Sequence, residues 1–63
     1  MIKEGETYKY VPDGSIVEIK SIMIEAFGLI ALVQLKFPES KREVLDEVTD
    51  LEEYSKNFQE LRT

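Results

Sequence analysis

The sequence predicts a small, mainly β domain of five strands with one short helical turn before the last strand. Turn signals built on Pro and Gly divide the chain at short intervals, and the segments between them are rich in β-branched and aromatic residues. A helix-start signal stands near the C-terminal end. The 63 residues are 43% hydrophobic and 33% charged, which predicts one folded domain over residues 1–63.

The first strand is predicted immediately before the first turn. Residues 6–10 alternate in character, with Tyr8 and Tyr10 on one side, as expected for a short, half-exposed strand. In the Pro-Asp-Gly turn that follows, Pro12 presets the backbone and Gly14 accepts a left-handed conformation. These residues predict a hairpin.

The second strand is predicted over residues 16–25, which are rich in β-branched side chains and lack a helical stripe. Its alternation is not uniform, because the polar positions change face near Ser21. A β-bulge or a bend there would let one strand serve two sheets, as strands do at the corners of small barrels.

The third strand is predicted to be central. It follows a turn at residues 26–28, where Gly28 is free to take a positive φ. One set of alternate positions in residues 29–37 is wholly apolar, and the other set becomes polar only toward the end. This pattern predicts a strand covered on both faces at its start. Pro38 then supplies another turn.

Two interpretations are open from about residue 39 onward. Apolar residues at helical spacing allow one helix over residues 39–61, which would pack on a three-stranded antiparallel meander. Like-charge pairs four residues apart disfavour that helix. Thr49 or Asp50, followed by glutamates, also looks like a helix start in mid-segment. We therefore favour a strand over residues 42–49, a helical turn over residues 51–57 and a closing strand over residues 58–61.

This order of elements is that of small five-stranded SH3-like barrels. The segments from Gly5 to Tyr10 and from Leu51 to Leu61 strengthen the comparison. Together with the Pro-Asp-Gly turn, they resemble small SH3-like proteins of bacteriophages, prophages and Firmicute genomes. Those proteins open with a Gly-x-x-Tyr-Lys strand and close with a Leu-Glu-Glu-aromatic segment that ends in Asn-Phe and an aliphatic residue. The resemblance implies a barrel and a phage or prophage setting, and it implies no reaction.

The composition excludes several kinds of chemistry. With no Cys and no His, the chain lacks the residues for thiol or His-assisted nucleophilic catalysis, for a disulfide and for a typical zinc site. It also lacks a calcium-loop motif and a Gly-rich phosphate loop. We therefore expect no cofactor, no metal and no catalytic residue.

The charge balance bears on the partner. Thirteen acidic and eight basic residues give a net charge of −5, and most of the excess lies in residues 39–63. Nucleic-acid binders need clustered Lys and Arg, so we expect no nucleic-acid ligand. An acidic surface suits a basic protein partner, and it also serves solubility.

Three tyrosines are the first candidate binding residues. Tyr8 and Tyr10 share a strand face and Tyr54 lies in the predicted helical turn, so the three would form the floor of a groove for a Pro-rich or extended peptide. The structural alternative is that they wrap the edge of the core with their hydroxyls in water.

The second candidate is the apolar surplus of the third strand. If Ile30 and Leu32 are not covered within one chain, they form a patch for another protein or for a homodimer, and Ile22 and Ile24 would extend it. The alternative is burial of both faces within the chain.

The sequence therefore predicts a non-enzymatic protein–protein interaction module that binds an unidentified protein. The alternative hypothesis is an acidic DNA mimic that inhibits a basic host protein. The longest apolar stretch, residues 27–33, is far shorter than the ~20 residues of a membrane span, and residues 1–6 do not form a secretory leader. We expect no membrane association and a cytoplasmic location, which the absence of Cys also favours.

Overall fold

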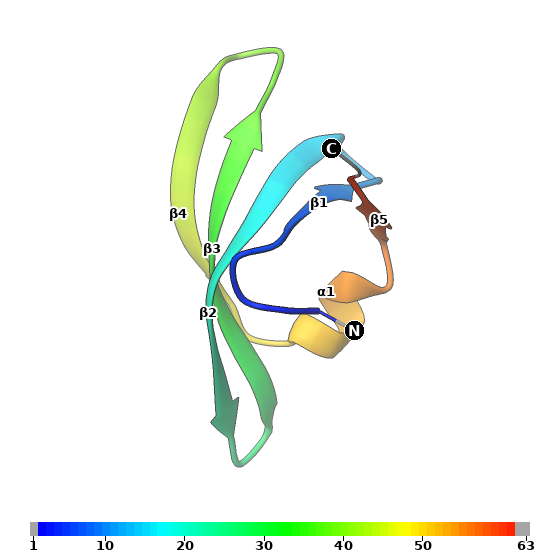
Figure 1. Ribbon diagram of the computed structural model, residues 1–63. Helices are drawn as coiled ribbons and strands as arrows, with labels where there is room; N and C mark the ends of the chain where they lie inside the picture. Colours follow the sequence, from blue (N-terminus) through cyan, green and yellow to red (C-terminus); the bar gives the residue numbers. More distant parts are fainter. Residues whose placement is uncertain (1, 62–63) are drawn as a thin grey trace.

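Five strands and one short helix follow one another along the chain (Figure 1). The computed structural model describes residues 2–61. The elements are β1 (Thr7–Tyr10), β2 (Ser15–Glu25), β3 (Gly28–Phe37), β4 (Arg42–Val48), α1 (Leu51–Ser55) and β5 (Phe58–Glu60). The predicted mainly β fold and its order of elements are confirmed. The alternative helix over residues 39–61 is wrong, because the whole of β4 pairs with β3.

The strands form one antiparallel sheet in the order β4-β3-β2-β1-β5. Within residues 2–61 the sheet is open, with β4 and β5 as its edges. In Figure 1, β2, β3 and β4 form a tall curved layer, and β1, β5 and α1 all lie on one side of it. One face of the long strands is therefore covered and the other is not.

The turns follow the chemistry of their residues. In the β1–β2 turn, Gly14 has a φ of 74° and the Ser15 N–H donates a hydrogen bond of 2.8 Å to Asp13 Oδ1. In the β3–β4 turn, Lys41 takes a φ of 56°, which is uncommon for a residue with a Cβ. Both turns hold their hairpins in register.

A β-bulge interrupts β2 near Ser21, where the sequence predicts a bulge or a bend, but the strand stays within one sheet and does not serve two. Ile19 is opposite Val33, but Ser21 is opposite Leu32, so Lys20 is the additional residue. Because of this residue, Ile22 follows Ile19 onto the covered face. Beyond Ile19, β2 pairs only with β3.

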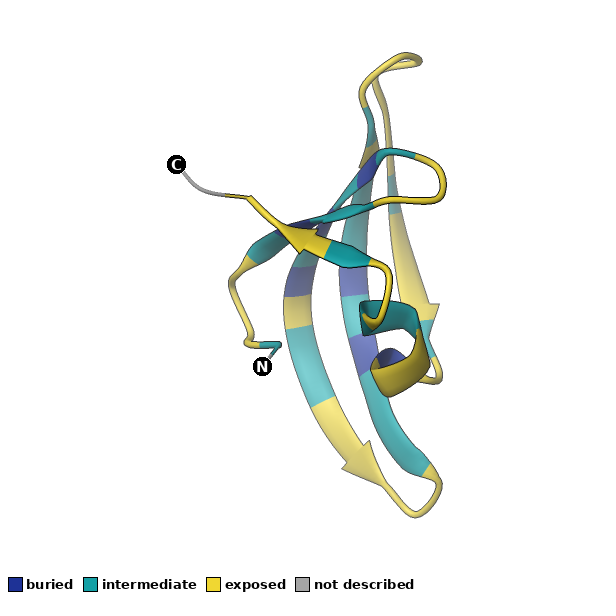
Figure 2. Cartoon of the chain, turned by 90° about the vertical axis from the view of Figure 1, so that its right-hand side faces the viewer, coloured by how far each residue is buried: buried dark blue, intermediate teal, exposed yellow. Residues whose placement is uncertain are grey.

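The core lies between the covered face and the elements beside it. Its buried residues come from four elements: Tyr8 from β1, Val17 and Ile19 from β2, Ala31 and Val33 from β3, and Leu51 from α1. Figure 2 shows this burial as dark bands midway along β2 and β3. Burying a large aliphatic side chain contributes about 1.5–3 kcal/mol, so Val17, Ile19, Val33 and Leu51 each stabilise the fold substantially.

The opposite face, here called the open face, carries Ile30 and Leu32. Leu32 is opposite Ser21 on β2 and Glu47 on β4, and Ile30 is opposite Met23, so these side chains share that face. Neither Ile30 nor Leu32 packs on the core. The prediction that the start of this strand is covered on both faces is therefore wrong, because Ala31 and Val33 are buried and the face with Ile30 and Leu32 is uncovered.

The helix α1 begins where the capping signal predicts. Asp50 is the N-cap, and its Oδ1 accepts a 3.2 Å hydrogen bond from the Glu53 N–H. Leu51 then points into the core and is 2% exposed. In the described part of the chain, this five-residue helix is far too short to cross a membrane.

Candidate functional site

An aromatic cluster joins the two ends of the chain. The ring centroids of Tyr10 and Tyr54 are 4.5 Å apart in a stacked arrangement, and Phe58 meets the Tyr54 ring edge-on at 5.0 Å. Phe58 also stacks on Tyr8 at 5.1 Å. The pairing of β1 with β5 places Phe58 opposite Tyr10, and α1 supplies Tyr54. Such aromatic pairs contribute about 0.5–1.5 kcal/mol each beyond their buried area.

The three candidate tyrosines differ in accessibility. Tyr8 is only 2% exposed, and its hydroxyl is buried without a hydrogen-bond partner among residues 2–61. Burial is also the main reason why the pKa of Tyr8 is raised. Tyr10 and Tyr54 are half-buried. Tyr8 therefore supports the cluster from the core, and Tyr10 and Tyr54 present its accessible surface.

A hollow of about 500 Å³ lies beside Tyr10 and Tyr54. Glu47 from the end of β4 and Asp50 and Glu53 from the start of α1 line it with these tyrosines. No lysine or arginine within residues 2–61 lines the hollow. We call it the acidic groove, defined by Tyr10, Glu47, Asp50, Glu53 and Tyr54.

The carboxylates of the acidic groove are only partly neutralised. Glu53 forms an exposed ion pair with Lys56 at 3.0 Å, whereas Glu47 and Asp50 form none within the described residues. Burial, together with the nearby carboxylates of Asp13 and Asp46, raises the pKa of Tyr54 to about 12. The groove is therefore a negative environment with an aromatic wall.

This environment predicts an alkaline loss of stability. Tyr54 has an ordinary pKa of 10.0 when unfolded and about 12 when folded. Between these values the unfolded chain has released the proton that the folded chain retains, so the free energy of unfolding falls as the pH rises. Urea unfolding at a series of pH values from about 9 to about 12 measures this fall. Tyr54→Phe should flatten it, and an unchanged slope in that variant would contradict the assignment.

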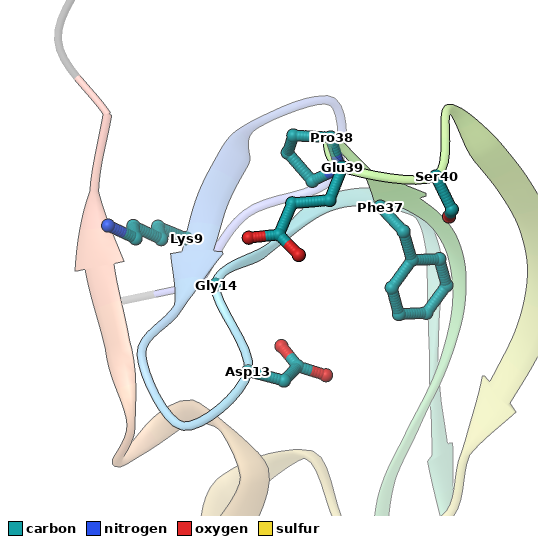
Figure 3. A pocket seen from close by; sticks show the side chains of 7 residues that line it. All are labelled: Lys9, Asp13, Gly14, Phe37, Pro38, Glu39 and Ser40. Carbon is teal, nitrogen blue, oxygen red and sulfur yellow. The ribbon is translucent and has the colours of Figure 1, made fainter.

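A second hollow, of about 320 Å³, lies between the β1–β2 turn and the β3–β4 turn. Figure 3 shows Glu39 reaching over it, with Lys9 on one side and Phe37 on the other. Asp13 and Gly14 of the β1–β2 turn line this hollow and not the acidic groove. The second hollow is lined by residues of both charges, Lys9, Asp13 and Glu39, so its lining indicates no particular ligand.

The structure does not bring Ile30 and Leu32 together with the tyrosines. Both are half-buried on the open face, where Met23 and Leu45 are the more exposed apolar neighbours, and Leu45 is 57% exposed. The bulge places Ile22 on the covered face, so it does not extend this patch.

A further pair of apolar side chains lies at the tip of the β2–β3 hairpin. Ile24 and Phe27 are almost completely exposed there, and the tip projects beyond the rest of the molecule in Figures 1 and 2. In the sequence, Phe27 is only part of a turn, because its exposure depends on how far the hairpin extends past the core.

Some residues of the groove and of the aromatic cluster were not predicted from the sequence to be binding residues. Phe58 links all three tyrosines, and Glu47, Asp50 and Glu53 line the hollow. The Asn-Phe-x-x-Leu ending of the chain and the mid-segment cap were the available signals. Within residues 2–61, no three His, Cys, Asp or Glu side chains are grouped closely enough to hold a metal ion.

Comparisons of this chain with protein-family models, with curated proteins and with solved structures found no match.

Proposed function

We propose that this protein is a non-enzymatic protein–protein interaction module whose acidic groove binds a basic segment of a partner. The observation that carries this proposal is the stacked pair of Tyr10 and Tyr54 at the wall of a hollow whose charged lining residues are all carboxylates. Aromatic rings bind the alkyl stems and guanidinium groups of Lys and Arg, and carboxylates pair with their charges. A cytoplasmic, phage or prophage setting is part of the same proposal.

The charge of the whole chain supports a basic partner. A net charge of −5 attracts a cationic segment at long range and increases its association rate at low salt. Glu47 and Asp50, which form no ion pair within residues 2–61, then give the bound segment its local contacts.

The fold proposed for this module is a partly open SH3-like barrel. Its support is the strand order, in which β1 lies between β2 and β5, and the short helix that precedes β5. The acidic groove then lies where the end of β4 comes closest to the β1–β5 side.

A peptide-binding assay tests the proposal. Fluorescence anisotropy with a labelled Lys- and Arg-containing peptide should show binding that Tyr10→Ala weakens by about tenfold or more, because an aromatic contact and a cation–π contact are lost together. Asp50→Asn keeps the helix-cap acceptor and removes one charge, so it should weaken binding by a smaller factor. Glu25→Gln at the hairpin tip is the matched control for net charge.

The same assay separates the two hypotheses of the sequence analysis. A DNA mimic would bind a basic protein through distributed charge, so its affinity would fall steeply with salt and would not respond to Tyr10→Ala. Retained binding by Tyr10→Ala, with a melting temperature close to that of the wild type, would therefore contradict the groove proposal.

A further inference from the structure

The edge of β4 is an unused hydrogen-bonding surface beside the acidic groove. One side of β4 pairs with β3 over seven residues, and among residues 2–61 no strand pairs with the other side. An exposed edge of this length is a template for another strand.

The backbone groups that point outward from this edge can be identified. The Glu47 N–H donates a 2.8 Å hydrogen bond to Asp46 Oδ1, its own neighbour, so it points away from β3. Alternation in an antiparallel ladder then turns the N–H and C=O groups of Leu45 and Glu43 outward as well.

The hydrogen bonds of β2 lead to the same directions for the backbone groups of β4. The Ile19 N–H donates to Glu6 O at 3.0 Å, away from β3. Val33, opposite Ile19, therefore directs its backbone groups toward β4, where Asp46 is its partner. Asp46 is thus bonded inward and Glu47 outward.

The side chains along this edge form an alternating pattern. On the open face, Leu45 is 57% exposed and lies between Glu43 and Glu47. On the covered face, Asp46 lies between Val44 and Val48, close enough to Tyr54 to help raise its pKa. The end of the strand, Glu47 and Val48, also lines the acidic groove, so the edge and the groove are continuous.

The charges select the occupant of this edge. A second copy carries the same net charge of −5, so long-range repulsion opposes its approach to this edge. β4 carries three acidic residues and one arginine, so the complementary strand is basic.

We propose that β4 binds an extended, basic segment of the partner as an added antiparallel strand. This inference rests on the proposed function, because it identifies how the same partner segment continues from the groove. The segment places Lys or Arg opposite Glu47, Asp46 and Glu43 and apolar side chains opposite Leu45 and Val44. When it binds, its backbone replaces Asp46 as the acceptor for the Glu47 N–H.

Peptide backbone chemistry provides the test. The probe is a labelled peptide with the core Lys-Arg-Val-Ile-Lys, flanked by threonines. N-methylation of the two residues that would face Leu45 and Glu47 removes two hydrogen bonds and should weaken binding by about tenfold or more. N-methylation of the alternate residues, whose N–H groups point away from β4, is the matched control and should have little effect.

A charge exchange tests the register. Glu43→Lys should weaken binding of the probe by about fivefold, and a probe whose last Lys is replaced by Glu should restore it. Glu43 does not line the groove, and Glu25→Lys makes the same change of net charge far from the edge. Glu25→Lys should change the affinity of neither probe by more than about twofold.

The outcomes separate the two proposals. Strand addition is supported if N-methylation weakens binding only at the residues that face Leu45 and Glu47, and if the probe with Glu in place of its last Lys restores binding to Glu43→Lys. Binding that requires Tyr10 but tolerates both N-methylated probes overturns strand addition and leaves the groove proposal standing. No binding of any probe overturns both. A homodimer in sedimentation that Leu45→Glu dissociates also overturns strand addition by the partner, because a second copy then occupies the edge.

Discussion

Val33→Glu is expected to abolish the folded state. Val33 is 0% exposed in the middle of β3, directly opposite Ile19 on one side and Asp46 on the other. An unpaired buried charge costs about 3–5 kcal/mol, which is comparable with the whole stability expected of a domain below ~70 residues. Far-UV circular dichroism and urea unfolding should show no cooperative transition at neutral pH.

Leu32→Glu is the matched control for this prediction, since the same substitution is made one residue away on the open face. Leu32 is half-buried, and the new carboxylate would be opposite Glu47, so a loss of about 1–2 kcal/mol is expected with the fold retained. Equal losses at both positions would mean that the two faces of β3 are covered alike, against the assignment of an open face.

Leu51→Ala is expected to produce the second largest effect. Leu51 is 2% exposed and is the buried residue of α1, so its truncation leaves a cavity and removes the contact that holds the helix on the sheet. Such truncations cost about 2–5 kcal/mol. The stack of Tyr54 on Tyr10 should loosen as well, because α1 carries Tyr54.

Glu52→Ala, at the next and exposed position of α1, is the control and should cost less than about 1 kcal/mol. Urea unfolding gives the stabilities, and tyrosine near-UV circular dichroism reports the aromatic cluster. If Leu51→Ala retained both the wild-type stability and the wild-type tyrosine signal, α1 would not be anchored by Leu51.

The order of the elements along the chain could be predicted from the sequence because its signals are local. Pro12, Gly14, Gly28 and Pro38 mark the turns, and each element boundary of the structure lies within about two residues of the predicted one. The bulge near Ser21 was also visible, since one additional residue shifts the alternation of every residue after it.

Which face of β3 is covered could not be predicted from the sequence in the same way. Both sets of alternate positions are apolar over the first half of the strand, so the pattern cannot tell Val33 from Leu32. The difference arises because α1 and the β1–β5 pair lie on one side of the sheet. These are contacts between residues distant in the sequence.

In the candidate site, too, the local features could be predicted from the sequence and the long-range contacts could not. The alternation of Tyr8 and Tyr10 correctly places both rings on one face, but it does not predict that Phe58 stacks on Tyr8 while the Tyr8 side chain is buried in the core. The acidic groove likewise depends on the approach of β4, α1 and the end of β1, which are far apart along the chain.

The pairing of β1 with β5 has a consequence for how the protein is made. The hairpins β2–β3 and β3–β4 join neighbouring segments, so they can form early, whereas β1 gains its second neighbour only from residues 58–60. The sheet stays incomplete until residues 58–60 have docked on β1. Until then β1 has one free edge and its tyrosines lack their contacts with Phe58, so this interval of folding is the time of greatest exposure to chaperones and aggregation.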